Sequence, residues 1–254
     1  MQIADMIDGP IQLVSFDLYD TLVEADPPGW VRFQRALEQT GFNVDLPQVM
    51  RAYASGQRFF TQENERSPIR ERTPEGIEEF RLTLTGVSLE ALDLPTDLET
   101  VSRVQQAFQD DTRSEHPLGY RTFDEVASVL ARLKKQHIRL AVISNADSDV
   151  TRFCLRMGFA EMMDVIVTSA LVGWEKPDPR TFYAALEPFN LPAASALHVG
   201  DQPESDVVGA RAIGMAAALL DRYDQYADAD VEAERVESLT QLVDLIEEYN
   251  ASFT

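Results

Sequence analysis

The sequence predicts an α/β protein: a Rossmann-like parallel-sheet core with an all-helical segment inserted into it. Apolar runs predict buried strands at residues 11–16, 138–143, 165–168, 196–199 and 215–220. A segment with helical periodicity precedes each of the last four runs, which is the alternation of a parallel sheet. Strand patterns are absent between about residues 26 and 116, where the periodicity is helical throughout.

Capping residues mark the ends of two predicted helices in the core. Asp178 followed by Pro179 is typical of a helix start, and the helix predicted at 204–213 ends before Gly214. Amphipathic stretches predict four helices in the insert, at 30–40, 46–60, 74–84 and 97–108. Turn-forming residues bound this region at 27–29 and 116–119. We therefore predict a core domain of residues 1–25 and 117–254 and a helical domain of residues 26–116.

Composition limits the partners and the compartment. The chain has 254 residues and a net charge of −21, which argues against nucleic acid because phosphate backbones are bound mainly by Lys and Arg. No apolar run reaches the length of a membrane span, and the N-terminus lacks the basic start of a signal peptide. The single cysteine, Cys154, cannot form an internal disulfide. We expect a cytoplasmic protein without a membrane partner, and leave its oligomeric state open.

Polar residues lie at the ends of predicted strands or in the segment that follows a strand. An open parallel sheet binds ligands at this edge. A carboxylate at a strand tip, Asp17, is a candidate covalent nucleophile. Ser144 and Asn145 offer hydroxyl and amide donors for an anion, and Lys176 supplies a compact positive charge. Asp201 and Asp206 offer the oxygen ligands that Mg²⁺ prefers.

These pieces together resemble the four motifs of the haloacid dehalogenase-like hydrolase superfamily, with the inserted helices resembling its cap domain. The matching segments are residues 17–22 (Asp-Leu-Tyr-Asp-Thr-Leu), 143–145 (Ile-Ser-Asn), 176–179 (Lys-Pro-Asp-Pro), 199–201 (Val-Gly-Asp) and 206–210 (Asp-Val-Val-Gly-Ala). Each motif is weak alone, whereas all four in this order with a helical insert after the first are specific. The resemblance covers the chain up to about residue 220.

The resemblance implies a Mg²⁺-dependent phosphatase acting on a small phosphorylated metabolite. In that case Asp17 attacks phosphorus and forms an aspartyl-phosphate, while Ser144 and Lys176 neutralise the transferring group. The implied metal ligands are Asp17, the main-chain carbonyl of Tyr19, and Asp201, with Asp206 either a ligand or beside the metal. Thr21 and Asn145 complete the implied phosphate-binding set with Ser144 and Lys176.

Tyr19 departs from the phosphatase pattern, in which the residue two beyond the nucleophile is an Asp that protonates the leaving group. A phenol with an ordinary pKa near 10 is a poor acid at neutral pH, and losing a general acid costs about 10²–10⁴-fold in rate. We therefore expect weak activity on ordinary phosphomonoesters. The substrate could have a leaving group that needs little protonation, or Asp20 could deliver a proton through water, although Asp20 better fits a turn-capping role.

Two alternatives stay open. Tyr is the residue that metal-free 2-haloacid dehalogenases of the superfamily carry at the position of Tyr19, although Asp201 stands where they carry no carboxylate. A non-catalytic member that binds a metabolite is the other alternative. His198 lies inside a predicted strand and is expected to be a buried core residue. In the insert, cations such as Arg32 and Arg35 could contact a substrate, but the sequence singles out none of them.

Overall fold

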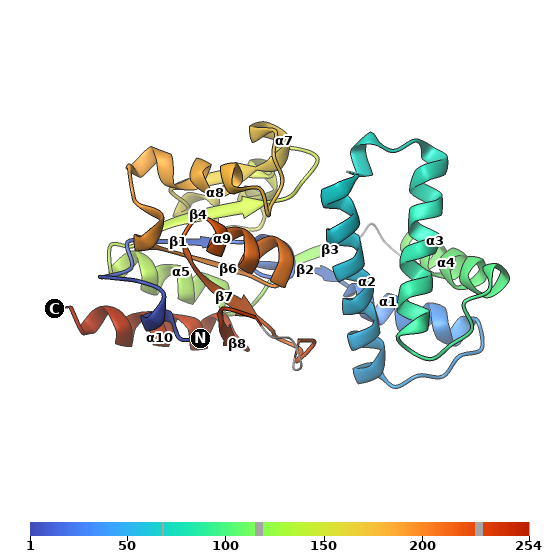
Figure 1. Cartoon of the computed structure of the whole chain (residues 1–254). Helices are drawn as coiled ribbons and strands as arrows, with labels where there is room; N and C mark the ends of the chain where they lie inside the picture. Colours follow the sequence, from blue (N-terminus) through green and yellow to red (C-terminus); the bar gives the residue numbers. More distant parts are fainter. Residues whose placement is uncertain (68, 115–118, 227–230, 254) are drawn as a thin grey trace. The chain divides into compact units, whose positions relative to one another are not determined.

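The computed structural model describes residues 1–67, 69–114, 119–226 and 231–253 (Figure 1). The chain divides into two compact units, one of residues 1–24 and 121–254 and the other of residues 25–120. The predicted domain boundaries were residues 26 and 116, of which the second lies outside the described residues.

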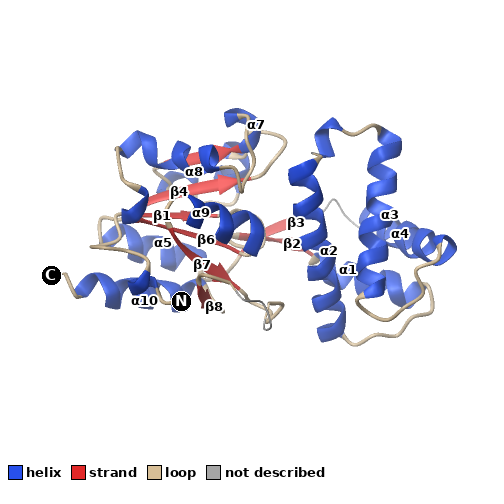
Figure 2. Cartoon of the chain, in the orientation of Figure 1, coloured by secondary structure: helices blue, strands red, loops and turns tan. Residues whose placement is uncertain are grey.

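The first unit contains a six-stranded sheet in which every recorded pairing is parallel (Figure 2). Its strands, in the order β5-β4-β1-β6-β7-β8, are β5 (Val165–Thr168), β4 (Arg139–Ser144), β1 (Leu13–Phe16), β6 (Ala196–Gly200), β7 (Ala216–Leu220) and β8 (Glu234–Val236). Five of these strands were predicted within two residues at each end. The predicted α/β fold with a parallel sheet is therefore confirmed.

The strand register places the site. Phe16, the last residue of β1, pairs with Val142 of β4 on one side and with Val199 of β6 on the other. β1 ends at Phe16, β4 ends two residues beyond Val142, and β6 ends one residue beyond Val199, so the three strand ends lie at one edge of the sheet, its carboxyl-terminal edge. Asp17, Ser144 and Gly200 are therefore at this edge.

Helices cover both faces of this sheet (Figure 1). Alternation along β1 sends Val14 and Phe16 into one apolar cluster and Leu13 into the other. The first cluster contains residues of α5 (Val126–Lys135), α6 (Thr151–Arg156) and α10 (Leu239–Ala251), and the second contains residues of α8 (Pro179–Leu186) and α9 (Gly209–Ala212). Single turns complete the unit, namely α7 (Ser169–Val172), η1 (Ile3–Asp5), η3 (Ala160–Met162), η4 (Glu187–Phe189) and η5 (Ala193–Ser195).

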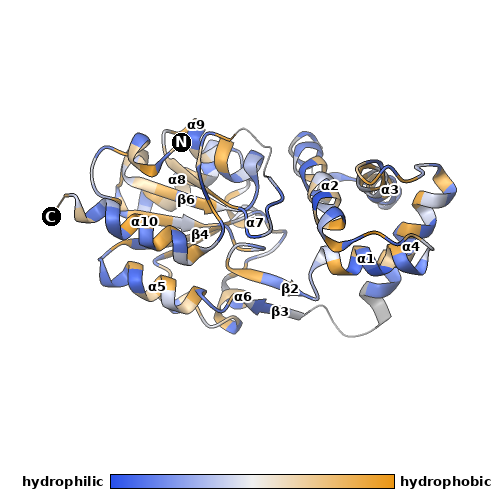
Figure 3. Cartoon of the chain, turned by 90° about the horizontal axis from the view of Figure 1, so that it is seen from below, coloured by the Kyte–Doolittle hydropathy of each residue, from blue (hydrophilic) through white to orange (hydrophobic). Residues whose placement is uncertain are grey.

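The second unit consists mainly of four helices: α1 (Gly29–Gln39), α2 (Leu46–Arg66), α3 (Pro74–Glu90) and α4 (Leu98–Ser114), with the turn η2 (Ile69–Glu71) between α2 and α3. Hydrophobic and hydrophilic residues occupy different sides of these helices (Figure 3). In α1 the buried residues are Trp30, Arg32, Phe33, Ala36 and Leu37, which have the spacing of one helix face. An arginine on that face is unusual, since charged side chains are rarely buried without a partner.

Three strands were missed by the sequence prediction, because they are short and carry polar residues. They are β8, β2 (Val23–Asp26) and β3 (Gly119–Thr122). β2 and β3 pair with each other in a two-stranded sheet that contains both points where the chain passes between the units. The helix predicted at 204–213 instead begins as a wide π-helical turn, η6 (Pro203–Val208), and continues as α9 before Gly214, whose φ is +78°.

Among the described residues, no helix is both long enough and apolar enough to cross a bilayer.

Candidate active site

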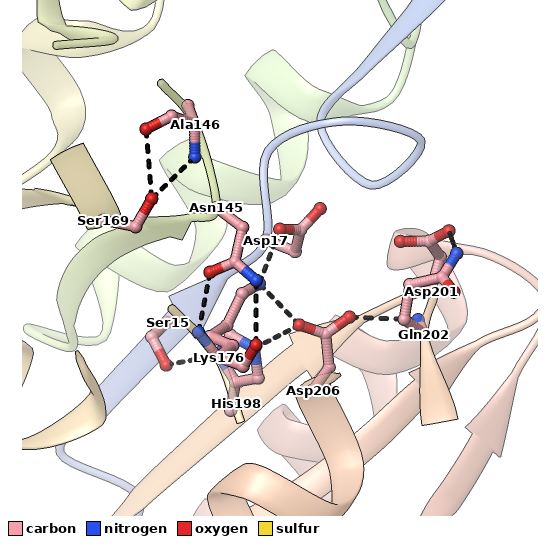
Figure 4. A network of polar contacts seen from close by, with 10 residues as sticks. All are labelled: Ser15, Asp17, Asn145, Ala146, Ser169, Lys176, His198, Asp201, Gln202 and Asp206. Carbon is pink, nitrogen blue, oxygen red and sulfur yellow. Dashed lines mark hydrogen bonds and ion pairs between the residues drawn. The ribbon is translucent and has the colours of Figure 1, made fainter. Parts of the chain in front are cut away.

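A buried ion-pair network lies at the carboxyl-terminal edge of the sheet, centred on Lys176 (Figure 4). Lys176 Nζ donates to Asp17 Oδ1 at 2.6 Å and to Asp206 Oδ1 at 2.5 Å, and the lysine is only 4% exposed. The main-chain N–H of Asp17 donates to the carbonyl of Val199 at 2.8 Å, which fixes the first residue after β1 against β6. The sequence analysis selected all three charged residues, and the structure brings them into direct contact.

Asp206 is bonded through both carboxylate oxygens. Oδ1 also contacts His198 Nε2 at 3.1 Å, and Oδ2 accepts from the main-chain N–H of Gln202 at 3.0 Å. The π-helical turn η6 carries Asp206. The Asp206 side chain packs directly on Gly200, where a Cβ would lie 2.1 Å from Asp206 Cγ. Glycine at position 200 is therefore required by the close approach of Asp206.

Burial and mutual charge set the protonation of these groups. Burial raises the pKa of Asp17 to about 7, with Asp206 adding to the rise and Lys176 opposing it. Burial also disfavours the charged forms of Lys176 and Asp206. The attraction of Asp17 and Asp206 outweighs it at Lys176 and keeps the lysine pKa above its usual value, whereas Lys176 and the hydrogen bond from His198 hold the pKa of Asp206 below its usual value. Lys176 is thus a fixed positive charge and Asp206 a fixed negative charge at neutral pH.

Asp201 follows β6 and points toward the same edge as Asp17 (Figure 4). Its Oδ2 accepts from Gln202 Nε2 at 2.7 Å. Burial raises its pKa well above the ordinary value, and the negative charges of Asp20 and Asp17 raise it further. Carboxylates that repel one another in this way need a proton or a cation to share the site.

This donor set fits a hard cation. Asp17 and Asp201 carry carboxylate oxygens at this edge, which are a ligand type of Mg²⁺, and the main-chain carbonyl of Tyr19 is the third ligand that the family resemblance implies. The described residues contain no group of three or more His, Cys, Asp or Glu side chains placed to hold a metal. A magnesium ion would therefore rely on two carboxylates together with main-chain, water and substrate oxygens, as is usual for this ion.

Asn145 fixes the main chain that carries Lys176. Its Oδ1 accepts from the Lys176 N–H at 2.7 Å, and its Nδ2 donates to the Lys176 carbonyl at 2.9 Å. Asn145 was predicted to bind an anion, whereas in the structure its amide bonds the lysine loop in both directions.

Two serine or threonine hydroxyl groups of the core unit are enclosed without a hydrogen-bond partner among the described residues. They are Oγ of Ser144, at the end of β4, and Oγ1 of Thr21, in the turn after Asp17. A buried hydroxyl group without a partner costs free energy, so such groups are often reserved for a ligand. Both were predicted to bind phosphate.

Tyr19 is half-buried, and its ring packs on Phe153 with the centroids 5.7 Å apart. Tyr19 therefore has an apolar neighbour on the side of Phe153. The phosphatase pattern has a carboxyl group, not an aromatic ring, at this position.

The sequence analysis missed one part of the network. His198 is fully buried, as expected, but it links the core to the site because its Nδ1 contacts Ser15 Oγ at 2.9 Å. Burial lowers the pKa of His198, so the ring is neutral. A carboxylate can only accept, so Nε2 donates to Asp206 and Nδ1 accepts from Ser15. Ser15 and His198 are register partners, and a polar residue in each of two adjacent buried strands was the available signal.

Comparisons with known proteins agree with this geometry. Residues 11–214 match the family described as haloacid dehalogenase-like hydrolase, so the chain belongs to that family and is a hydrolase. A bovine haloacid dehalogenase-like hydrolase domain-containing protein 3 is 25% identical over 210 residues, which cover 83% of this chain and 82% of the relative. A phosphoserine phosphatase from Thermus thermophilus is 36% identical over 104 residues, which cover 41% of this chain and 42% of the relative.

A solved structure extends the similarity over most of the chain. The crystal structure of a 2-haloacid dehalogenase from Pseudomonas syringae is 26% identical, with a TM-score of 0.51, and the match covers 94% of this chain and 99% of that one. Against several curated relatives, the chain spans about half of their length or less.

Proposed function

We propose that the protein is a Mg²⁺-dependent phosphatase that acts on a small phosphorylated metabolite through an aspartyl-phosphate at Asp17. The observation that carries the proposal is the set of donors around this carboxylate. A paired lysine and two enclosed hydroxyl groups without partners suit an anion with several oxygens, such as a phosphoryl group.

Asp17 is suited to attack because its position is fixed on two sides. Its main chain is bonded to β6, and its Oδ1 is held by Lys176. A carboxylate held beside a bound phosphoryl group needs no further reorientation to form the acyl phosphate. We propose that Lys176, kept protonated by its two carboxylate partners, neutralises charge on the transferring oxygens.

Asp17, the Tyr19 carbonyl and Asp201 would hold the magnesium ion, which neutralises phosphate charge and lowers the cost of bringing an anion to two carboxylates. For Asp206 we propose a positioning role beside the metal, because Lys176, His198 and Gln202 already engage both of its oxygens. Asp206 then acts by fixing the lysine.

Ser144 and Thr21 are proposed to donate to phosphoryl oxygens. Asn145 is proposed to act on phosphate through Lys176, since its amide holds the lysine main chain. The acidic surface implied by a net charge of −21 repels phosphorylated substrates, so a local cation and a metal ion are needed to capture one.

A metal-free 2-haloacid dehalogenase is the second candidate. Tyr19 favours it, and so does the whole-chain similarity to the Pseudomonas syringae dehalogenase. Asp201 argues against it, because an ionised second carboxylate would repel both Asp17 and an anionic haloacid unless a cation were present. The phosphatase similarity to the Thermus thermophilus protein supports the first candidate.

The test is a screen of phosphorylated metabolites for phosphate release, with Mg²⁺ and with EDTA. Asp17→Asn is the matched blank, because it keeps the size of the side chain and removes the nucleophile. We expect release only from the unmodified protein with Mg²⁺. Chloride release from 2-chloropropionate in EDTA would establish the dehalogenase instead. A Mg²⁺-loaded protein that binds metabolites but turns over neither class would be the non-catalytic family member.

A further inference from the structure

The helical unit buries a positive charge, and its described residues supply no counter-charge. Within the described part of the chain two cationic residues are buried, Lys176 at 4% and Arg32 at 9% exposed. Lys176 bonds two carboxylates, whereas no described residue forms a hydrogen bond or ion pair with Arg32. Nε and Nη1 of Arg32 are enclosed and have no acceptor among the described residues.

The contacts of Arg32 compensate only part of the cost of its burial. Its guanidinium lies over the ring of Phe108 on α4, 4.8 Å from the centroid. A cation–π contact recovers less free energy than a guanidinium loses when two of its nitrogens leave water without acceptors. The chain has 43 acidic residues against 22 Lys and Arg, yet none of the acidic residues that the structure describes pairs with this arginine. An acceptor from outside the chain would complete the site.

The surroundings of Arg32 are aromatic and preorganised. Phe33 packs edge-on against Phe108, with 6.2 Å between ring centroids, and contacts Tyr53 in a tilted arrangement at 6.3 Å. The hydroxyl of Tyr53 lies against Gly29, where a Cβ would be 2.2 Å from it, so only glycine allows this approach. Arg32, in the first turn of α1, therefore lies over Phe108 of α4, and this ring is the first of three that pack in series with Phe33 of α1 and Tyr53 of α2.

We propose that the helical unit holds an anion-binding site centred on Arg32, which takes the carboxylate or phosphoryl group of a small metabolite. The planar guanidinium presents pairs of N–H groups that match both oxygen anions. Nε and Nη1 have no acceptor among the described residues, and each forms a fork with Nη2, so an oxygen anion at Nη2 can bind bidentately. The apolar part of the metabolite packs on the rings. The proposal is independent of the phosphatase assignment, because binding is its readout.

The test compares full-length variants by thermal unfolding. Arg32→Met removes the charge at similar length, Arg32→Lys keeps the charge without the fork, and Arg35→Met is the matched control. Arg35 lies on the same helix, but its side chain is 46% exposed and 3.9 Å from Asp111. Malonate and inorganic phosphate are the probes, each at about 20 mM against sodium chloride of equal ionic strength.

Without an added anion, Arg32→Met is expected to raise the unfolding midpoint by about 2–4 °C, because it removes an unpaired buried charge. A structural arginine would give a lower midpoint, and that result would overturn the proposal. Malonate or phosphate should raise the midpoint of the unmodified protein and of Arg35→Met by about 2–5 °C, and that of Arg32→Met by less than half as much. Arg32→Lys should respond in between. Equal responses of Arg32→Met and the unmodified protein would also overturn it.

Inhibition of p-nitrophenyl phosphate hydrolysis distinguishes the two possible sources of the anion, the substrate itself and a separate effector. Inhibition by malonate that raises KM alone, and disappears in Arg32→Met, assigns the site to the substrate's own anionic group. An Arg32-dependent change in kcat assigns it to a separate effector metabolite. Both results support the anion site, and the midpoint comparison decides it whether or not this ester is turned over.

Discussion

Raising the pH is expected to destabilise the metal-free protein, because Asp17 keeps a proton in the folded state at pH values where the unfolded chain has lost it. Burial, reinforced by Asp206 and opposed by Lys176, raises the pKa of Asp17 from 3.8 to about 7. A group of this kind contributes its full stability below about pH 4 and loses it as the pH rises through about 7. At about 1.4 kcal/mol per pH unit, a rise of about three units corresponds to about 4 kcal/mol.

For a chain of this length, about 4 kcal/mol corresponds to about 8–16 °C in the unfolding midpoint, and about two thirds of this change falls between pH 5 and pH 8. The assay is circular dichroism melting in EDTA between pH 5 and pH 8, for the unmodified protein and for Asp17→Asn. Asparagine cannot ionise, so the midpoint difference between the two proteins isolates Asp17. Contributions from His198 and Asp201 largely cancel in this comparison, because both proteins contain them. If the two proteins showed the same pH dependence, the reasoning would be refuted.

Magnesium should reverse the effect. A cation shared by Asp17 and Asp201 favours their ionised forms, so Mg²⁺ competes with protons for the site. We expect added Mg²⁺ to raise the midpoint several degrees at pH 8 and hardly at pH 5, and EDTA to remove the gain. A Mg²⁺ response that was equal at both pH values, or that persisted undiminished in Asp17→Asn, would place the ion elsewhere.

Three further substitutions test the parts of the site separately. Tyr19→Asp supplies the missing proton donor and should raise kcat on a simple phosphomonoester by about 10–100-fold in steady-state assays, and an unchanged kcat would dismiss the role of Tyr19. His198→Phe removes the hydrogen-bond partner of Ser15 and one of the partners of Asp206. It should lower the free energy of unfolding by about 2–3 kcal/mol and lower kcat about tenfold. Unaltered kinetics would show that the histidine does not contribute to the site. Gly209→Ala places a Cβ 2.6 Å from the ring of Phe182 and should cost about 1–3 kcal/mol in denaturant titrations, whereas a neutral result would show that the helix can shift.

The core was predictable because its strands are apolar runs between turn residues. The strands at 165–168 and 216–220 have no competing interpretation as helices, since each is too short and is followed by polar or turn-forming residues. The helix start at Asp178 was equally explicit, and Asp178 accepts from the N–H of Arg180 as a cap should. By contrast β8, with the sequence Glu-Arg-Val, gains its strand geometry from pairing with β7, which no local pattern reveals.

The site was predictable in its members but less so in their contacts. Residue type and order identified Asp17, Lys176 and Asp206, yet the bonding of Asp206 to the lysine depends on the wide turn of η6, which a helical pattern does not predict. His198 was expected to be a buried core residue. Its link to the site was not predictable, because its partners come from a neighbouring strand and from η6. The burial of Arg32 likewise depends on how α1 and α4 pack, which amphipathicity alone leaves open.

The most direct test of Asp17 as the phosphoryl acceptor is beryllofluoride binding, which mimics an aspartyl-phosphate. Fluorine NMR and mass spectrometry would measure the stoichiometry with Mg²⁺, with EDTA and in Asp17→Asn. We expect one beryllofluoride per chain with Mg²⁺, and none in the other two conditions. Absence of the adduct in the Mg²⁺-loaded protein, together with halide release from 2-chloropropionate in EDTA, would contradict phosphoryl transfer.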